Sequence, residues 1–346
     1  MEADAPRRLT LDEFQPRSML VTEEHSVPKP RFAVIDAHNH AWDESPAARF
    51  VETMDRCGVR QTVILDAPLG EEFSRFMDDW VGPFTDRFLP YTNLEWRQVN
   101  DAGWPERMAA AVADTAQRGA RGLKVPKSLG LRIRDAQERL YAIDDPRFDP
   151  MWAQCGAEGI PVCIHTGDPA AFFEPLNETN ERWEELHAHP HWHFHGGDYP
   201  GLRELLEQLW RAVKKHPGTT WYGAHVGNYA ENLGYVAQML DDCPNYHVDI
   251  SERIPELGRQ PRAARRFFLQ YQDRILFGTD RPATEGHVWP TWYRLLETED
   301  EYFAYSPDPI PRQGRWRVYG LGLPDEVLAK VYHANAERLI PGARLS

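Results

Sequence analysis

Short apolar runs alternate with segments of helical spacing along most of the chain. Eight segments have apolar residues three and four positions apart and are predicted to be helices: 47–58, 71–81, 104–119, 148–159, 202–216, 229–242, 262–273 and 289–297. Each is preceded by a short apolar run that is predicted to be a strand: 32–38, 62–67, 88–95, 122–125, 161–166, 220–226, 246–251 and 275–280. Eight strand–helix units predict an α/β protein with a parallel sheet closed into a (β/α)8 barrel, a TIM barrel. An open doubly wound sheet is the alternative, but no GxGxxG follows the first strand.

The remaining segments are predicted to decorate one barrel domain, residues 32–346. Residues 1–31 are polar and contain Pro28 and Pro30, which predicts an N-terminal arm without helix or strand. Residues 168–199, after the fifth strand, and 300–320, after the eighth helix, are predicted to be loop insertions. The segment 324–340 has helical spacing and is predicted to be an extra C-terminal helix packed on the outside of the barrel.

Composition narrows the class of protein. The 346 residues are 42% hydrophobic and carry a formal net charge of -14, which disfavours nucleic acid and anionic membranes as partners. No apolar run approaches the roughly 18 residues of a membrane span, so we expect a soluble, cytoplasmic protein. The four cysteines are far apart and form no CxxC pair, which argues against a disulfide framework. The partner we expect is a small-molecule substrate, and a homo-oligomer is left open.

Ionisable side chains follow five of the predicted strands at their C-terminal ends, where barrel enzymes build their sites. His38 and His40 end the first strand, and alternation along an extended chain points both the same way. The others are Lys124, His165, His225 and Asp280. Taken singly, such a histidine is commonly structural, such an aspartate caps a helix, and such a lysine is solvated. Four histidines, one aspartate and one lysine on one face of a barrel predict a metal site.

The segments that carry these residues resemble a known family. VIDAHNH, GLKV, IHTGDP, YGAHVGN, ILFGTDRP and HANAERL resemble the amidohydrolase superfamily, specifically its amidohydrolase-2 branch of metal-dependent barrels, and span residues 32 to 340. The resemblance implies that His38, His40, His165 and His225 are metal ligands. It implies that Asp280 is both a ligand and a proton shuttle. Lys124 stands where some relatives carry a carboxylated lysine that bridges two metals, although Lys127 could bridge instead, or one metal could bind without a carbamate.

This ligand set suits one or two zinc, iron or manganese ions. A bound ion lowers the pKa of water, so the first hypothesis is attack of a metal hydroxide on an amide, lactone or ester, with Asp280 taking the proton. Without a carbamate, His225 would be free to act as acid or base. Alternatives are a di-iron oxygenase for a bulky, partly apolar substrate, a non-oxidative decarboxylase, which Lys124 disfavours, and a non-catalytic binding protein.

The densest group of histidines lies elsewhere, in HAHPHWHFH at residues 187–195. If this stretch is extended, its five imidazoles share one face. It lies in the first insertion and contains Pro190, so we interpret it as part of a lid over the metal site. His193 and His195, together with Trp42 and Arg281, are the candidates for substrate binding.

Overall fold

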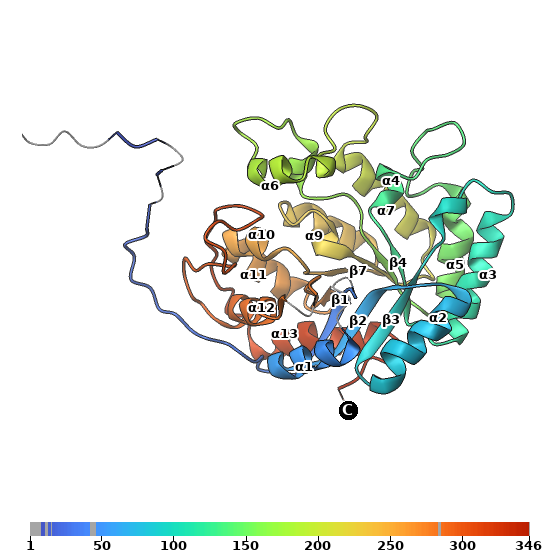
Figure 1. Ribbon diagram of the computed structural model, residues 1–346, viewed down its shortest axis with the longest axis horizontal. Helices are drawn as coiled ribbons and strands as arrows, with labels where there is room; N and C mark the ends of the chain where they lie inside the picture. The colour runs from blue at the N-terminus through green and yellow to red at the C-terminus, as the bar shows by residue number, and fades with distance from the viewer. Residues whose placement is uncertain (1–7, 11–12, 15, 42–45, 283–284, 346) are drawn as a thin grey trace, which may run out of the picture.

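The barrel is built from eight parallel strands in one sheet (Figure 1). The computed structural model describes residues 8–10, 13–14, 16–41, 46–282 and 285–345. Each strand pairs in parallel with the next in sequence. The strands are β1 (Val34–Asn39), β2 (Val59–Ala67), β3 (Phe88–Asn93), β4 (Gly122–Val125), β5 (Val162–Ile164), β6 (Trp221–Gly223), β7 (Tyr246–Asp249) and β8 (Ile275–Leu276).

Backbone hydrogen bonds join the first strand to the segment that follows the last. The amide of Ala37 donates to the carbonyl of Phe277 at 2.8 Å, and the amide of Asp280 donates to the carbonyl of His38 at 2.8 Å. The sheet therefore returns to its first strand, and the predicted TIM barrel is confirmed.

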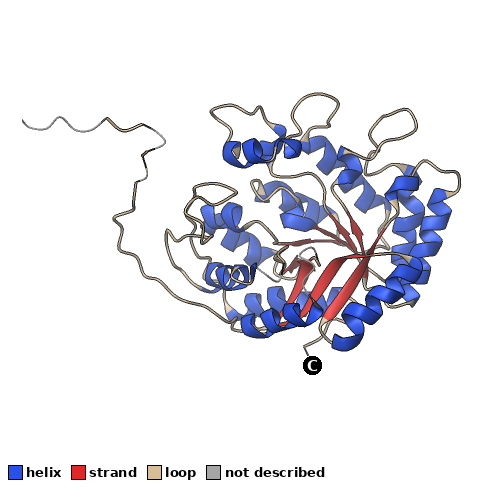
Figure 2. Ribbon diagram, in the orientation of Figure 1, coloured by secondary structure: helices blue, strands red, loops and turns tan. Residues whose placement is uncertain are grey.

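Helices surround the strands, as Figure 2 shows. All eight predicted helices are present: α1 (Ala47–Cys57), α2 (Gly70–Phe76), α3 (Trp104–Gln117), α5 (Asp149–Glu158), α7 (Leu202–Lys215), α9 (Leu233–Asp242), α11 (Pro261–Gln270) and α12 (Val288–Glu297). Shorter elements are α4 (Ser128–Leu131), α6 (Trp183–Ala188), α8 (Ala224–Gly227), α10 (Ile254–Arg259), α13 (Asp325–Ala329) and α14 (Asn335–Leu339). In α7 the leucines at 202, 205, 206 and 209 are buried together, so helical spacing becomes one apolar face on the barrel.

Glycines make room for large aromatic side chains on both faces of the sheet. A Cβ on Gly122 would lie 2.2 Å from the ring of Tyr91, and one on Gly223 would lie 1.9 Å from Tyr246 Oη. Any other residue at these two positions would overlap an aromatic side chain, because interiors are already close-packed.

The C-terminal segment packs on the barrel in two ways. Val327, Leu328, Val331 and Tyr332 pack in the buried cluster between the strands and the surrounding helices, as predicted. Ala336 and Ile340 pack instead with the interior strand residues Ile35 and Leu89. The side-chain amide of Asn335 donates to the carbonyl of Ile275 at the start of β8, at 2.8 Å. Residues 335–340 thus cover the N-terminal end of the barrel, opposite the strand ends that carry the predicted ligands, and for these residues the expectation of packing outside is wrong.

The predicted arm and insertions lie at the surface. The described residues before β1 form no helix or strand, and Figure 1 shows the segment leading away from the barrel. It joins the body at His25, whose amide donates to Asp300 at 2.8 Å.

The first insertion holds α6 and two 3-10 turns, Ala170–Phe173 and Pro190–Trp192. Among the described residues, no helix has the length and apolar character needed to cross a membrane.

Candidate metal centre

A cavity of about 420 Å³ opens at the C-terminal ends of the strands. Its wall includes all six of the predicted metal-site residues: His38, His40, Lys124, His165, His225 and Asp280. They come from β1, β4 and the segments that follow β5, β6 and β8. Barrel closure thus brings together side chains that are up to 242 positions apart in sequence.

Three of these side chains form the tightest potential ligand group. His38, His225 and Asp280 each offer one ligand atom, and these atoms lie within 4.8 Å of one another. Asp280 Oδ2 lies 3.7 Å from the Nε2 atoms of both His38 and His225. Two nitrogens and one carboxylate oxygen at these separations can contract onto one transition-metal ion, whose bonds to such ligands are about 2.0–2.2 Å long.

Two more imidazoles border this group. His40 Nε2 lies 3.4 Å from Asp280 Oδ1, and His165 Nδ1 lies 3.3 Å from His225 Nε2. The pairing of β1 with β2 shifts register between Asp36 and Asn39, at the end of β1 that carries His38 and is followed by His40. Such irregularities re-aim side chains at strand ends.

Hydrogen bonds fix which nitrogen of each central histidine faces the cavity. His38 Nδ1 donates to Asp249 Oδ2 at 2.8 Å, and His225 Nδ1 donates to the carbonyl of Ser251 at 3.0 Å. Because each Nδ1 carries the proton, each Nε2 presents its lone pair to Asp280. Metal-binding histidines are commonly oriented in this way by a carboxylate or a carbonyl. The residues present therefore fit a metal ion.

The backbone at the ligands is unusual. His225 and Asp280 both have left-handed conformations, with φ of 59° and 56°. Non-glycine residues rarely adopt this region, and it is enriched at functional sites. The His225 amide donates to Asp249 Oδ1 at 3.0 Å and the Asp280 amide donates to the His38 carbonyl, so the same hydrogen bonds that hold the barrel hold these conformations.

Burial sets the protonation of the site. It lowers the pKa of His40 and of His225 well below the usual value, and lowers that of His165 to about 4. Burial alone would raise the pKa of Asp280, but the neighbouring histidines and Lys124 together outweigh it and lower the pKa to about 2. These directions favour neutral imidazoles at His40, His165 and His225 and an ionised carboxylate at Asp280, which are the protonation states that bind a metal.

Lys124 points into the same group. Its Nζ lies 3.3 Å from His38 Nε2 and 3.6 Å from Cys163 Sγ, and it forms no ion pair with the described residues. Lys127, the other candidate for a bridging group, is paired with Asp168 at 2.7 Å. Carboxylation of Lys124 stays a prediction.

Aromatic side chains form another part of the wall. The rings of Phe172 and Trp192 both line the cavity and stack with centroids 6.3 Å apart and planes inclined by 16°. Lys127 Nζ lies 5.4 Å from the centroid of Trp192, a cation–π distance. Both aromatic residues belong to the first insertion, so that insertion supplies a flat apolar surface to the metal cavity.

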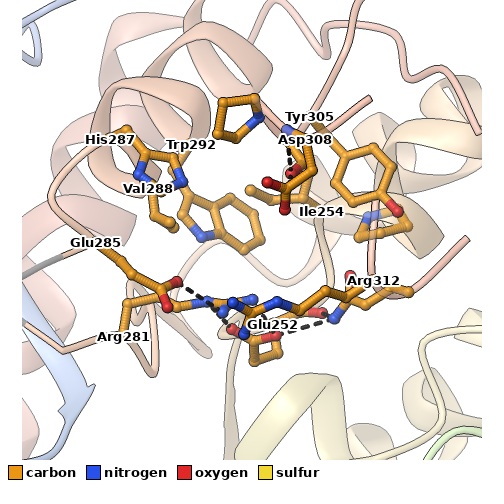
Figure 3. Close-up of a pocket in the computed structure, with 14 residues that line it drawn as sticks. Glu252, Ile254, Arg281, Glu285, His287, Val288, Trp292, Tyr305, Asp308 and Arg312 are labelled. Carbon is orange, nitrogen blue, oxygen red and sulfur yellow. Dashed lines mark hydrogen bonds and ion pairs between the residues drawn. The ribbon is translucent and has the colours of Figure 1, made fainter. Parts of the chain in front are cut away.

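Arg281, a candidate for substrate binding, stands between this cavity and a second one of about 180 Å³ (Figure 3). Its guanidinium donates to Glu252 at 2.7 Å and to Glu285 at 2.9 Å, and Gln313 donates to Glu252 at 2.9 Å. Glu252, Arg281 and Gln313 line both cavities. The network therefore forms a partition, beyond which Figure 3 shows Trp292 and Tyr305.

Two of the other candidates for substrate binding, His193 and His195, are not on the wall of the metal cavity. Trp42 is outside the described residues. His193 Nε2 bonds to the carbonyl of Glu174 at 2.8 Å and His195 Nδ1 to that of Phe173 at 2.9 Å, and neither residue is among those lining the metal cavity. Their role in substrate binding stays a prediction.

Sequence reasoning missed the residues that orient and complete the site. Asp249 and Ser251 hold His38 and His225, and Arg253 lines the cavity. All three follow or end β7, a strand end that is absent from the predicted site. The signal was available, since Asp249 ends a buried apolar run just as Asp280 follows one.

A family model described as amidohydrolase matches residues 35–342. The chain belongs to the amidohydrolase family. The resemblance predicted from the motifs at the strand ends is therefore confirmed, and the family is one of enzymes. The sequence matches none of the curated proteins with which it was compared.

Solved structures share the fold at low sequence identity. An uncharacterized TIM-barrel protein from Bordetella bronchiseptica is 18% identical, with a TM-score of 0.56 over 89% of this chain and 98% of that one. A 2,6-dihydroxybenzoate decarboxylase from Rhizobium is 16% identical, with a TM-score of 0.55 over 89% and 98%. A dihydroxybenzoic acid decarboxylase from Polaromonas sp. JS666, with bound manganese and the inhibitor 2-nitroresorcinol, is 15% identical, with a TM-score of 0.57 over 89% and 96%. These likenesses establish the barrel.

Proposed function

We propose that this protein is a metal-dependent, non-oxidative decarboxylase of an aromatic carboxylic acid. The observation that carries the proposal is that one cavity is lined both by the His38–His225–Asp280 group and by the stacked rings of Phe172 and Trp192. The names of the similar structures, which include dihydroxybenzoate decarboxylases and one with manganese bound, add support.

The metal site would be formed by His38, His225 and Asp280, with His40 and His165 beside them. A divalent ion there supplies positive charge that binds the substrate carboxylate and withdraws electron density from it. The protein positions the rest of the substrate. Phe172 and Trp192 border the space for the substrate ring, and an aromatic contact contributes about 0.5–1.5 kcal/mol beyond the burial of area.

Decarboxylation replaces a carbon–carbon bond by a carbon–hydrogen bond, so the ring carbon must receive a proton as CO2 leaves. Asp280 is our candidate for the group that holds this proton. Its Oδ1 is buried and has no hydrogen-bond partner within the described part of the chain.

Hydrolysis of a lactone, ester or amide is the second candidate, and Lys124 is the observation that favours it. Its amine lies 3.3 Å from His38 Nε2, close enough for a carboxylated form to join the ligand group. Two ions and a metal hydroxide would then be expected, whereas the decarboxylase requires one ion and no activated water.

The test combines metal analysis with product analysis. Protein purified without added metal is analysed for its elements, loaded with Mn²⁺, and incubated with benzoic acids that carry an ortho hydroxyl. We expect release of CO2 and, in D2O, one deuterium at the carbon that lost the carboxylate. Asp280→Asn should abolish release. Hydrolysis of lactones or esters without CO2 from any aromatic acid would overturn the proposal.

A further inference from the structure

Two imidazoles of the histidine row at 187–195 hold a neighbouring loop by hydrogen bonds. His193 Nε2 lies 2.8 Å from the carbonyl oxygen of Glu174. His195 Nδ1 lies 2.9 Å from the carbonyl oxygen of Phe173. Because a carbonyl oxygen can only accept, each of these ring nitrogens must carry a proton and donate.

Two further hydrogen bonds complete the connection between the loops. The amide of Phe194 donates to the carbonyl of Phe172 at 2.8 Å. On the other side, Asn180 Nδ2 donates to the carbonyl of Ala171 at 2.8 Å. Each of the four carbonyls from residue 171 to residue 174 therefore accepts a hydrogen bond from a neighbouring segment, and two of the four donors are imidazoles.

The loops joined in this way carry the aromatic wall of the metal cavity. Phe172 lies in the turn Ala170–Phe173, and Trp192 directly precedes His193. The rings of Phe172 and Trp192 stack and border the cavity, as described above, whereas His193 and His195 do not line it. The placement of the two aromatic rings therefore depends on imidazole–carbonyl bonds that lie outside the cavity.

A third histidine of the row packs against the indole itself. The ring of His189 stacks on that of Trp192, with centroids 4.2 Å apart and planes inclined by 25°. This contact and the bonded backbone after Trp192 restrict the rotamers open to the indole. A side chain that is ordered before a ligand binds loses less conformational entropy on binding, which increases affinity.

We propose that His193 and His195 are positioning residues, which hold the Phe172–Trp192 wall in the arrangement that binds the ring of an aromatic acid. The two histidines act on the ligand through the wall and not by contact, and their N–H donors carry the effect. This rests on the proposed function for the class of ligand but not for the reaction.

The test uses two carboxylates of equal ring size, benzoate and cyclohexanecarboxylate, whose binding to the Mn²⁺-loaded protein is measured by calorimetry. We expect the wild type to bind benzoate about 2- to 13-fold more tightly, the range for an aromatic contact. The double variant His193→Leu/His195→Leu removes both donors and should remove this preference. The double variant His193→Gln/His195→Asn should keep it, because an amide N–H replaces each ring N–H at nearly the same position.

Three controls separate positioning from damage to the fold. His187→Leu removes a histidine of the same row, whose ring stacks on the exposed Trp183, and should leave the preference unchanged. Mn²⁺ affinity should be the same in every variant, because the substituted histidines do not line the metal cavity. In a Trp192→Leu background, the leucine pair should have no further effect on the preference, because residues that act as one unit are not additive.

If the leucine pair does not fold, His195→Leu alone gives the same comparison with His195→Asn. Equal binding of the two probes by the wild type overturns the inference, and so does a preference that survives loss of the imidazoles. Loss of the preference in the amide variants, or an effect of the leucine pair that persists without Trp192, overturns it as well. If the preference follows the expected pattern but no aromatic acid releases CO2, the positioning role stands and the proposed reaction fails.

Discussion

The hydrogen bond from His38 Nδ1 to Asp249 leads to a prediction about metal affinity. It distinguishes the effect of the His38 tautomer from the effect of removing one negative charge. Asp249 accepts four hydrogen bonds, and its Oδ1 takes three of them: from the amides of His225 and Ser251 at 3.0 Å each and from Ser251 Oγ at 2.6 Å. In Asp249→Asn these three donors would hold the amide oxygen in place of Oδ1. The amide nitrogen would then face His38 Nδ1.

An amide nitrogen donates, so His38 Nδ1 would have to accept. The ring proton would move to Nε2, the atom 3.7 Å from Asp280 Oδ2, and the lone pair that binds the metal would be lost. The lost charge-assisted bond alone is worth about 1.5–3 kcal/mol. Loss of an outer partner of a metal-bound histidine typically costs 10- to 100-fold in metal affinity, or about 1.4–2.7 kcal/mol. We therefore expect Mn²⁺ affinity to fall by about 10- to 100-fold.

The assay is titration of metal-free protein with Mn²⁺ at pH 7.5, with free Mn²⁺ followed by electron paramagnetic resonance. Circular dichroism checks that the fold is kept. Asp241→Asn is the matched control, because it removes the same charge from an exposed carboxylate that accepts Tyr271 Oη at 3.0 Å. An Asp249→Asn protein that is folded and binds Mn²⁺ within threefold of wild type would refute the tautomer reasoning.

Three further predictions concern the wall, the barrel and the pH dependence of stability. Trp192→Leu should raise KM for aromatic acids by about 2- to 13-fold in steady-state assays, from the aromatic contribution alone, and an unchanged KM would exclude stacking. Gly223→Ala should lower the free energy of unfolding in urea by about 3 kcal/mol because of the overlap with Tyr246, whereas Gly218→Ala, with nothing within 4 Å of the added Cβ, should stay within about 0.5 kcal/mol. Burial lowers the pKa of His247 to about 3 from 6.5, so below pH 6.5 the unfolded chain binds the proton first and stability is lost as pH falls towards 3. Between pH 6 and 4, His247→Gln should make the loss shallower by about 1 kcal/mol per pH unit, and equal slopes would contradict the shift.

The barrel and the ligand set could be predicted because both depend on periodicity along the chain. Alternating periods of two and 3.6 residues marked every strand and the eight main helices. Because parallel strands all run in the same direction, their C-terminal ends lie together at one end of the barrel. Gly122, Gly223 and Gly278, each two positions before an ionisable strand-end residue, were predicted to suit a crowded interior. Close contacts confirm this at Gly122 and Gly278, whereas Gly223 is crowded by Tyr246 on the outer face of the strands.

Contacts between strands could not be read in the same way. The proton on His38 depends on Asp249, 211 positions away, and periodicity says nothing about which side chain meets which across a barrel. The position of residues 335–340 could not be predicted for a related reason. An apolar face packs equally well against the outside of a barrel or against its open end, and the choice rests on polar contacts such as the bonds that Asn335 makes to the carbonyls of Gln272 and Ile275.

The histidine row at 187–195 shows why local density misleads. Residues two apart share a face only in an extended chain, whereas on a helix they point about 200° apart because each residue advances by about 100°. The stretch begins in α6 and continues through the turn Pro190–Trp192, so its imidazoles are spread over different directions, and no group of three among them could hold a metal. What the stretch gives the cavity is Trp192, which lies between two of the histidines and stacks on Phe172. Under the proposed function the row contributes to substrate binding through the Trp192 indole, and the candidate metal ligands are residues that stand alone in the sequence.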